Sequence, residues 1–99
     1  MGLRISLQDE FGKEREAIDD PRNLLHRFLP QDRSHVLGVI DWVGDTTFNR
    51  LQMDQFIHEW NALRDEMHSA EEKQLFRSVL SLAQHCQKNV HLYLKFIGD

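Results

Sequence analysis

The sequence predicts an α+β fold: an antiparallel or mixed sheet of about four to five strands, with two main helices and one short helix packed on one face. Three observations predict it. Segments 3–8 and 90–96 alternate apolar and polar residues, as half-buried strands do. Segment 54–67 carries apolar residues at helical spacing. A helix start signal at Ser69 precedes a second stripe of the same kind.

The first thirty residues predict a hairpin followed by a short helix. Residues 9–12 are turn-forming, so the charged segment 13–18 is expected to return beside the first strand as an exposed edge strand. Charge on such an edge discourages pairing with other sheets. Asp20 and Pro21 are the residue types of a helix N-cap and of a first helical position, and Pro30 would end that helix.

A corner is predicted after the next strand. The apolar segment 36–40 is expected to be central in the sheet, because both of its faces would be buried. We expect Gly44 to take a positive φ in a hairpin turn, and the Asp45 carboxylate to accept hydrogen bonds from nearby backbone N–H groups. Residues 46–48 then have strand propensity. Segment 41–49 is therefore interpreted as a structural corner.

The second half of the chain predicts two long helices and the clearest strand. Ser69 and Glu72 have the spacing of a capping box, in which each side chain bonds the other residue's backbone N–H. Asn89 is expected to end the second helix in the left-handed conformation. The predicted core combines one stripe from each helix with the inward side of the last strand: Phe56, Trp60, Leu63, Leu75, Val79, Leu82, Leu92, Leu94 and Phe96.

The composition limits the classes of function. The chain has 99 residues, with 40% hydrophobic and 28% charged residues, so one globular domain spanning residues 1–99 is expected. The net charge of −4 is spread evenly, and no basic stripe predicts a nucleic-acid partner. No apolar run approaches the ~18 residues of a membrane span, so no membrane partner is expected. The single cysteine excludes an internal disulfide and favours a cytoplasmic location.

The sequence predicts neither a metal site nor a cofactor, and it assigns no catalytic residue. His85, Cys86 and His91 lack the paired spacing of structural zinc ligands. Cys86 lies on an apolar stripe, which favours a buried, inert thiol. The chain has no glycine-rich phosphate loop and no serine in a nucleophile elbow.

Two segments carry a resemblance to known proteins. GDTTFNRLQ at residues 44–52 and HLYLKFIGD at residues 91–99, with two helices between them, resemble a group of small bacterial proteins of about this length. The resemblance covers nearly the whole chain. That group has no assigned activity, so the resemblance implies a stand-alone bacterial cytoplasmic domain and transfers no catalytic residues.

Three functional hypotheses follow. The first is a non-enzymatic protein that binds a partner protein, with an immunity protein that neutralises a toxin as one form. Its binding residues would lie on a sheet face open to water and at the corner: Arg4, Ser6, Gln8, His91, Tyr93, Lys95 and Trp42. The second is a small enzyme or ligand-binding domain that uses Asp41, Asp45, Asn49 and a histidine. The third is a homo-oligomer that pairs edge strands or buries the open sheet face.

Overall fold

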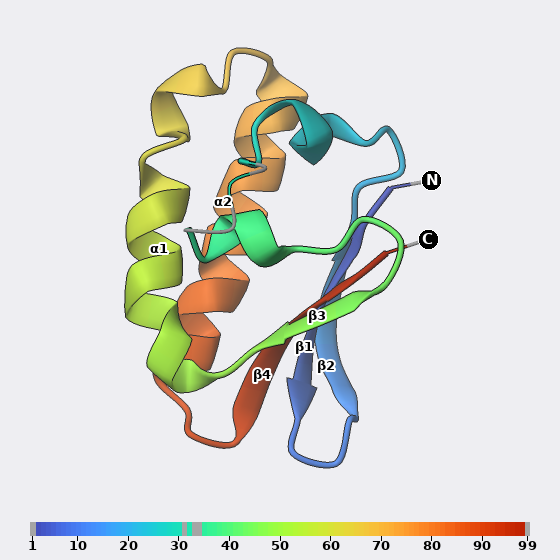
Figure 1. Cartoon of the computed structure of the whole chain (residues 1–99), viewed down its shortest axis with the longest axis vertical. Helices are drawn as coiled ribbons and strands as arrows, with labels where there is room; N and C mark the ends of the chain where they lie inside the picture. The colour runs from blue at the N-terminus through green and yellow to red at the C-terminus, as the bar shows by residue number, and fades with distance from the viewer. Residues whose placement is uncertain (1, 31, 33–34, 99) are drawn as a thin grey trace.

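A computed structural model of the chain describes residues 2–30, 32 and 35–98. It contains a four-stranded antiparallel sheet in the order β2-β1-β4-β3. The strands are β1 (Arg4–Asp9), β2 (Glu14–Asp19), β3 (Asp45–Phe48) and β4 (Leu92–Ile97). The helices α1 (Met53–Asn61) and α2 (Ala70–Gln87) lie side by side on one face of this sheet (Figure 1). The predicted α+β fold is therefore confirmed.

The first and last strands of the chain form the centre of the sheet. β1 pairs antiparallel with β2 on one side and with β4 on the other. The predicted hairpin between β1 and β2 is confirmed, and Gly12 in its turn has a φ of 80°. β2 lies at the sheet edge, as its charged sequence predicted. β3 lies at the other edge of the sheet and pairs with β4.

The core lies between the sheet and the two helices. All nine predicted core residues are buried, which confirms the assignment of the helix faces. An aromatic chain connects the layers: the rings of Phe96 and Phe48 from the sheet contact each other and Phe56 of α1. Phe56 in turn stacks on Trp60, which stacks on Phe76 of α2. Aromatic burial of this kind dominates the energetics of a small core.

The capping box at the start of α2 is confirmed. The Ser69 hydroxyl accepts a hydrogen bond from the Glu72 backbone N–H at 3.0 Å, and Glu72 Oε1 accepts from the Ser69 N–H at 3.1 Å. The His68 N–H donates to the same oxygen at 3.0 Å. The Ser69 N–H, followed by that of His68, lowers the pKa of the Glu72 carboxyl. Local sequence alone therefore specifies where α2 begins.

The prediction of a central strand at residues 36–40 is wrong. Residues Leu37–Val39 form a short 3-10 helix, η2, that packs near α1. Glu59 of α1 explains the difference, because its carboxylate accepts from the backbone N–H groups of Val36 at 3.1 Å and Leu37 at 2.9 Å. Burial raises the pKa of Glu59, but these hydrogen bonds and one from Gln55 outweigh it and lower the pKa. The backbone N–H groups of Val36 and Leu37, which a strand would have used for hydrogen bonds within the sheet, thus donate to a side chain.

The predicted short helix also differs in type and position. Residues Leu24–Arg27 form a 3-10 helix, η1, whose N-cap is Asn23 with a φ of 56°. Asp20 still caps this helix, although it lies three residues before the N-cap in the sequence. Its buried carboxylate accepts hydrogen bonds from the N–H groups of Leu24 and Leu25, both at 2.9 Å. The residue type was interpreted correctly, whereas the helix begins three residues later than predicted.

Two helix ends differ from the sequence prediction. α1 ends at Asn61, and a 3-10 turn, η4 (Arg64–Glu66), replaces its expected last turn. Asn89 does not take the left-handed conformation. Its side-chain oxygen instead accepts from the His91 N–H at 3.0 Å, while Lys88 caps α2 in a right-handed conformation. Asparagine here stabilises the connection to β4 through its side chain rather than through its backbone.

Candidate functional site

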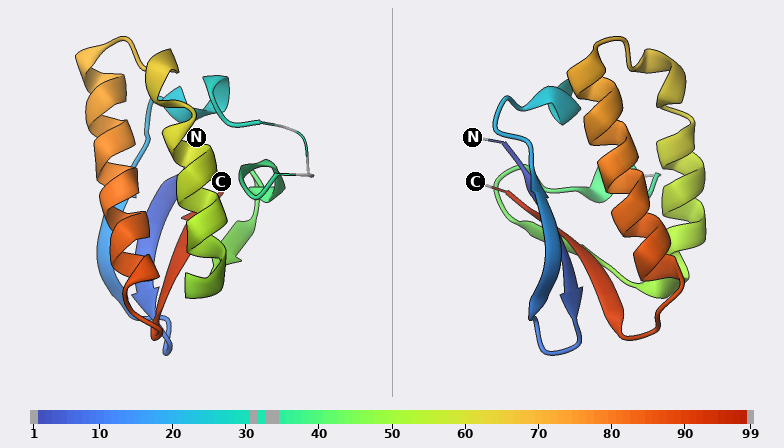
Figure 2. Two further views of the ribbon diagram at one scale, coloured as in Figure 1. Left: turned by 90° about the vertical axis from the view of Figure 1, so that its left-hand side faces the viewer. Right: turned by 180° about the vertical axis from the view of Figure 1, so that it is seen from behind.

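The sheet face turned away from the helices is the candidate site. No helix lies over it (Figure 2). The strand register places eleven residues on this outer face: Arg4, Ser6, Gln8, Glu14, Ala17, Asp19, Asp45, Thr47, Tyr93, Lys95 and Ile97. Arg4, Gln8, Tyr93 and Lys95, which the alternating pattern predicted for this face, are each partly exposed. We refer to these eleven residues as the outer face.

Ser6 is an exception to the predicted exposure of the outer face. It is fully buried, although it points away from the helices. Its hydroxyl donates to Glu14 Oε1 at 2.8 Å and accepts from Gln8 Nε2 at 3.1 Å. The longer side chains of Glu14 and Gln8 therefore cover it. A serine with both hydrogen-bonding roles filled is stable in such a position.

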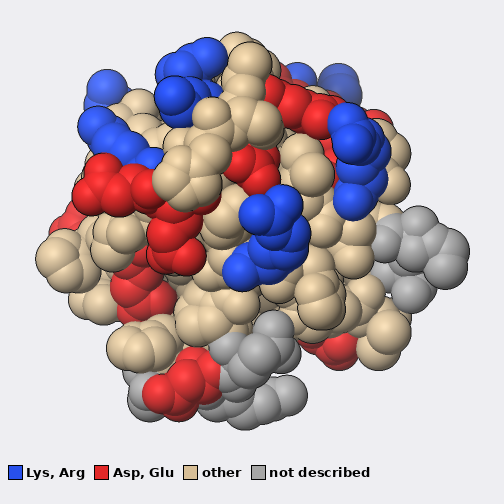
Figure 3. All heavy atoms as spheres, turned by 90° about the horizontal axis from the view of Figure 1, so that it is seen from above, with Lys and Arg blue, Asp and Glu red and all other residues tan. Residues whose placement is uncertain are grey.

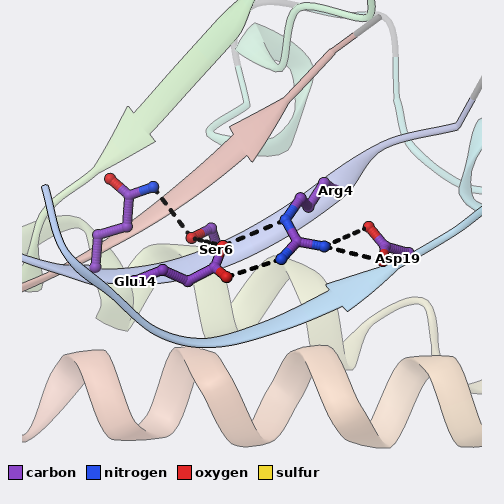
Figure 4. Close-up of polar contacts among 5 residues, drawn as sticks. Arg4, Ser6, Glu14 and Asp19 are labelled. Carbon is purple, nitrogen blue, oxygen red and sulfur yellow. Dashed lines mark hydrogen bonds and ion pairs between the residues drawn. The ribbon is translucent and has the colours of Figure 1, made fainter.

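Arg4 is fixed between two carboxylates of β2 (Figure 4). Its Nη1 donates to both Asp19 oxygens at 2.9 Å, and its Nη2 donates to Glu14 Oε2 at 2.7 Å. The hydrogen bond from Arg4 lowers the pKa of Glu14 and raises the pKa of Arg4 itself. A guanidinium bound on two sides loses little further freedom when a partner binds. Sequence reasoning missed Glu14 and Asp19, because edge-strand charge was interpreted only as protection against aggregation.

The β4 half of the outer face is less constrained. Lys95 Nζ lies 3.4 Å from Asp45 Oδ2 on the neighbouring β3. Tyr93 lies opposite Gln8 in the β1–β4 register. Its hydroxyl makes no hydrogen bond to any other described residue, so it is free to bind a partner. Ile97 is half-buried on the same face and adds apolar surface beside Arg4, its partner in the register.

Trp42 and His91 do not join the outer face. β4 begins at Leu92, so His91 lies in the preceding turn, with its Nδ1 3.4 Å from Glu10 Oε2. It lines a separate hollow of about 580 Å³ that His85 and Phe11 also line. Trp42 is half-buried against the core, with its ring centroid 5.0 Å from that of His26. The binding roles predicted for these two residues remain predictions.

The polar residues of the corner bind nearby groups separately. Asp41 Oδ1 accepts from the Val43 N–H at 3.0 Å, so Asp41 holds the turn that was assigned to Asp45. Asp45 instead begins β3 and pairs with Lys95. Asn49 caps the next 3-10 turn, η3 (Arg50–Gln52). Five hollows of about 250 to 580 Å³ lie on the described surface, and none of these five is lined by Asp41, Asp45 or Asn49.

The predicted hairpin conformation of Gly44 is wrong. Among the described residues, only Gly12 and Asn23 have a positive φ. The hairpin was expected to join segment 36–40 to β3. Because that segment is η2, β3 pairs with β4 instead, and the corner needs no tight turn of that type.

Within residues 2–30, 32 and 35–98, no group of three or more His, Cys, Asp or Glu side chains is arranged to hold a metal ion. Cys86 is fully buried, as predicted, and its Sγ donates to the Leu92 carbonyl oxygen at 3.5 Å. Burial raises the pKa of the thiol to about 11.

The folded protein is expected to resist thiol reagents. At pH 8, a pKa of about 11 leaves about one thiol in 10³ ionised, and burial slows access further. Reaction with a disulfide reagent in buffer should therefore be at least a hundredfold slower than in denaturant, where the thiol is exposed. Equal rates in the two conditions would contradict the buried position of Cys86.

Two surface properties bear on the class of partner. No helix among the described residues is long and apolar enough to cross a membrane. On the face drawn in Figure 3, groups of basic side chains alternate with groups of acidic ones. That face therefore presents a mixed charge rather than one continuous basic surface.

Comparison with known proteins gives no functional assignment. No family model matches the chain, and neither the curated proteins nor the solved structures include a match to it. The resemblance to small bacterial proteins therefore remains a prediction.

Proposed function

We propose that this protein binds a partner protein through the outer face of its sheet. The observation that carries the proposal is that this face has no helix over it and presents Tyr93, which is partly exposed and whose hydroxyl bonds no other described residue. Antiparallel sheets can leave one face open to water, and such a face can present aromatic and charged side chains to a partner. Tyrosine and arginine are the residue types enriched where binding energy concentrates.

The arrangement of the outer face suits binding better than catalysis. Arg4 is already fixed by Glu14 and Asp19, and Lys95 is close to Asp45, so the polar groups are ordered before a partner arrives. Ordering in advance reduces the entropy lost on binding. The charged groups Arg4, Glu14 and Asp19 are paired with one another, as are Lys95 and Asp45. Partner recognition would then depend on Tyr93 and on the apolar surface of Ile97.

The form of the partner is proposed from the whole chain. The sequence predicts a bacterial, cytoplasmic protein, and a small chain of that kind with a net charge of −4 has the general properties of immunity proteins that neutralise toxins. We include a toxin as the first partner to test.

Site-specific photo-crosslinking in the native cell would identify the partner. A photoreactive residue placed at position 93 should yield a discrete cross-linked protein. The same residue placed at position 84, on the exposed side of α2, should not. Binding of the purified partner is then measured by calorimetry. Tyr93→Ala is expected to weaken binding at least tenfold, or about 1.4 kcal/mol, and to destabilise the fold by less than that.

Matched controls separate binding from folding. Gln84→Ala should leave the affinity unchanged, because Gln84 lies on the helical side of the molecule. Equal cross-linking at positions 93 and 84, or wild-type affinity in Tyr93→Ala, would contradict the proposal. If the cross-linked product is a second copy of the chain, the protein is a homo-oligomer through this face. Pairing through β2 is disfavoured by its charged edge residues Glu14, Arg15 and Glu16.

A further inference from the structure

A second surface lies in the helical layer, between η4 and α2. It is a shallow groove of about 400 Å³, and we call it the cationic groove. Six residues line it: Arg64, Met67, Lys73, Phe76, Arg77 and Leu80. It shares no residue with the outer face of the sheet.

The groove has an apolar floor and a basic rim. Met67 and Phe76 are almost fully buried, and Leu80 is half-buried beside them. The guanidinium of Arg64 lies 5.5 Å from the Phe76 ring centroid, which places positive charge directly over that floor. Lys73 and Arg77 are exposed on α2. A ligand in the groove would therefore meet apolar surface beneath it and cations at its sides.

The three rim cations are not neutralised. Arg64 and Arg77 donate only to the neutral side chains of Asn61 and Gln74, at 2.9 and 3.2 Å. Within the described part of the chain, no carboxylate lies at ion-pair distance from these two arginines or from Lys73. Several other cations do have carboxylate partners: Arg4, Arg15, Arg22, Arg27 and Lys95. The rim thus carries three cations that have no carboxylate partner among the described residues, in a chain whose net charge is −4.

Lys73 is placed unfavourably beside Arg77. It is four residues before Arg77, so two like charges share one side of the helix. It is also the fourth residue of α2, near the positive end of the helix dipole, although Glu71 and Glu72 in the same first turn offset that effect. A residue that breaks a local rule is often a functional position. A bound anionic partner would relieve the repulsion between Lys73 and Arg77.

We propose that the cationic groove binds an acidic, amphipathic helical segment of a partner protein. The α2 residues that line it lie at positions 73, 76, 77 and 80, the i, i+3, i+4, i+7 spacing of one side of a helix. Such a stripe spans about 10 Å and matches apolar anchors at i, i+3 or i+4, and i+7 on a second helix. Carboxylates flanking those anchors would lie beside Arg64, Lys73 and Arg77. The proposal does not depend on the function of the outer face.

Two designed peptides would test the charge preference. The probe is a 16-residue peptide of Leu, Ala and Glu, blocked at both ends, with Leu at i, i+3, i+4 and i+7 and Glu on the flanks. Its twin carries Lys in place of every Glu. In nuclear magnetic resonance titrations of the labelled protein, the acidic peptide should shift the amides of residues 64–67 and 73–80. The basic twin should bind at least tenfold more weakly.

A pair of double variants would locate the binding site. Lys73→Gln with Arg77→Gln should weaken binding of the acidic peptide at least tenfold without lowering the melting temperature, because the like-charge pair is removed. Lys13→Gln with Arg50→Gln changes the net charge equally at exposed cations that lie outside the groove. That control should bind the acidic peptide as the wild type does.

Four results would overturn the proposal. The first is equal binding of the two peptides, and the second is unchanged affinity in the Lys73/Arg77 variant. The third is sedimentation of the protein with phosphatidylglycerol vesicles that is lost in the same variant, which would assign the groove to a membrane surface. The fourth is self-association of the wild-type chain that the same variant abolishes, which would make a second copy the occupant.

Discussion

Replacing Trp60 with alanine is expected to destabilise the protein by roughly 3–5 kcal/mol. Trp60 is fully buried, and its ring lies between Phe56 and Phe76, with centroids 5.8 Å away on each side and interplanar angles of 8° and 15°. Its Nε1 also donates to the Phe76 carbonyl oxygen at 3.1 Å. Alanine would leave a cavity at a side chain that joins α1 to α2 through both stacking and a hydrogen bond.

The loss is measured by urea unfolding followed by circular dichroism, because the substitution also removes one of the two tryptophan fluorophores. Total stability in domains of this size is about 5–15 kcal/mol, so the variant would be only marginally folded. Trp60→Phe is the control. It keeps most of the ring volume, and the Phe76 carbonyl can still accept its helical hydrogen bond, so a cost of about 1–2 kcal/mol is expected. A loss below about 1 kcal/mol for Trp60→Ala would mean that α1 and α2 are packed differently.

Elements whose stabilising groups lie close together in the sequence could be predicted. α2 begins where Ser69 and Glu72 indicated, because the two residues bond each other within one turn. β1 and β4 followed from alternation over six residues, which is sufficient when one face is buried. Their pairing as central neighbours was not predicted, since the contact between the two ends of the chain leaves no local signal.

Elements stabilised from a distance could not be predicted. Segment 36–40 has an apolar composition typical of a strand, but Glu59 supplies the acceptors for its backbone N–H groups from more than twenty residues away. The sequence does not indicate which distant backbone segment a helix carboxylate such as that of Glu59 will bind. Propensity is a weak guide where a tertiary contact of this kind decides the conformation.

The candidate site was predictable to the extent that strand alternation applied. Arg4, Gln8, Tyr93 and Lys95 reached the outer face because they lie within β1 and β4. His91 did not, since the strand begins one residue after it. The burial of Ser6 depends on Glu14, which reaches it after an irregularity in the β1–β2 register. Such a bulge shifts which residues share a face, and its position is not evident from the sequence.

The final prediction concerns the corner, where the glycine that the structure requires is Gly98 rather than Gly44. The Gly98 N–H donates to the Gly44 carbonyl oxygen at 2.7 Å. A Cβ on Gly98 would lie 2.6 Å from that oxygen and 2.6 Å from the carbonyl carbon and oxygen of Trp42. All three are backbone atoms, so relief requires the corner to move away from the end of β4. We therefore expect Gly98→Ala to cost about 1–3 kcal/mol in urea unfolding.

Gly44→Ala is the matched comparison, because it adds the same methyl group to the residue that accepts the hydrogen bond from Gly98. Its Cβ would lie 2.7 Å from Asp41 Oδ2, which is the end of a flexible, exposed side chain, and its φ is not positive. Rotation of that carboxylate relieves the clash and gives up one hydrogen bond to the Val43 N–H at the surface. A cost within about 0.5–1 kcal/mol is expected. If Gly44→Ala proves as destabilising as Gly98→Ala, the corner is held by the Asp41 turn, and the close backbone approach of Gly98 contributes little.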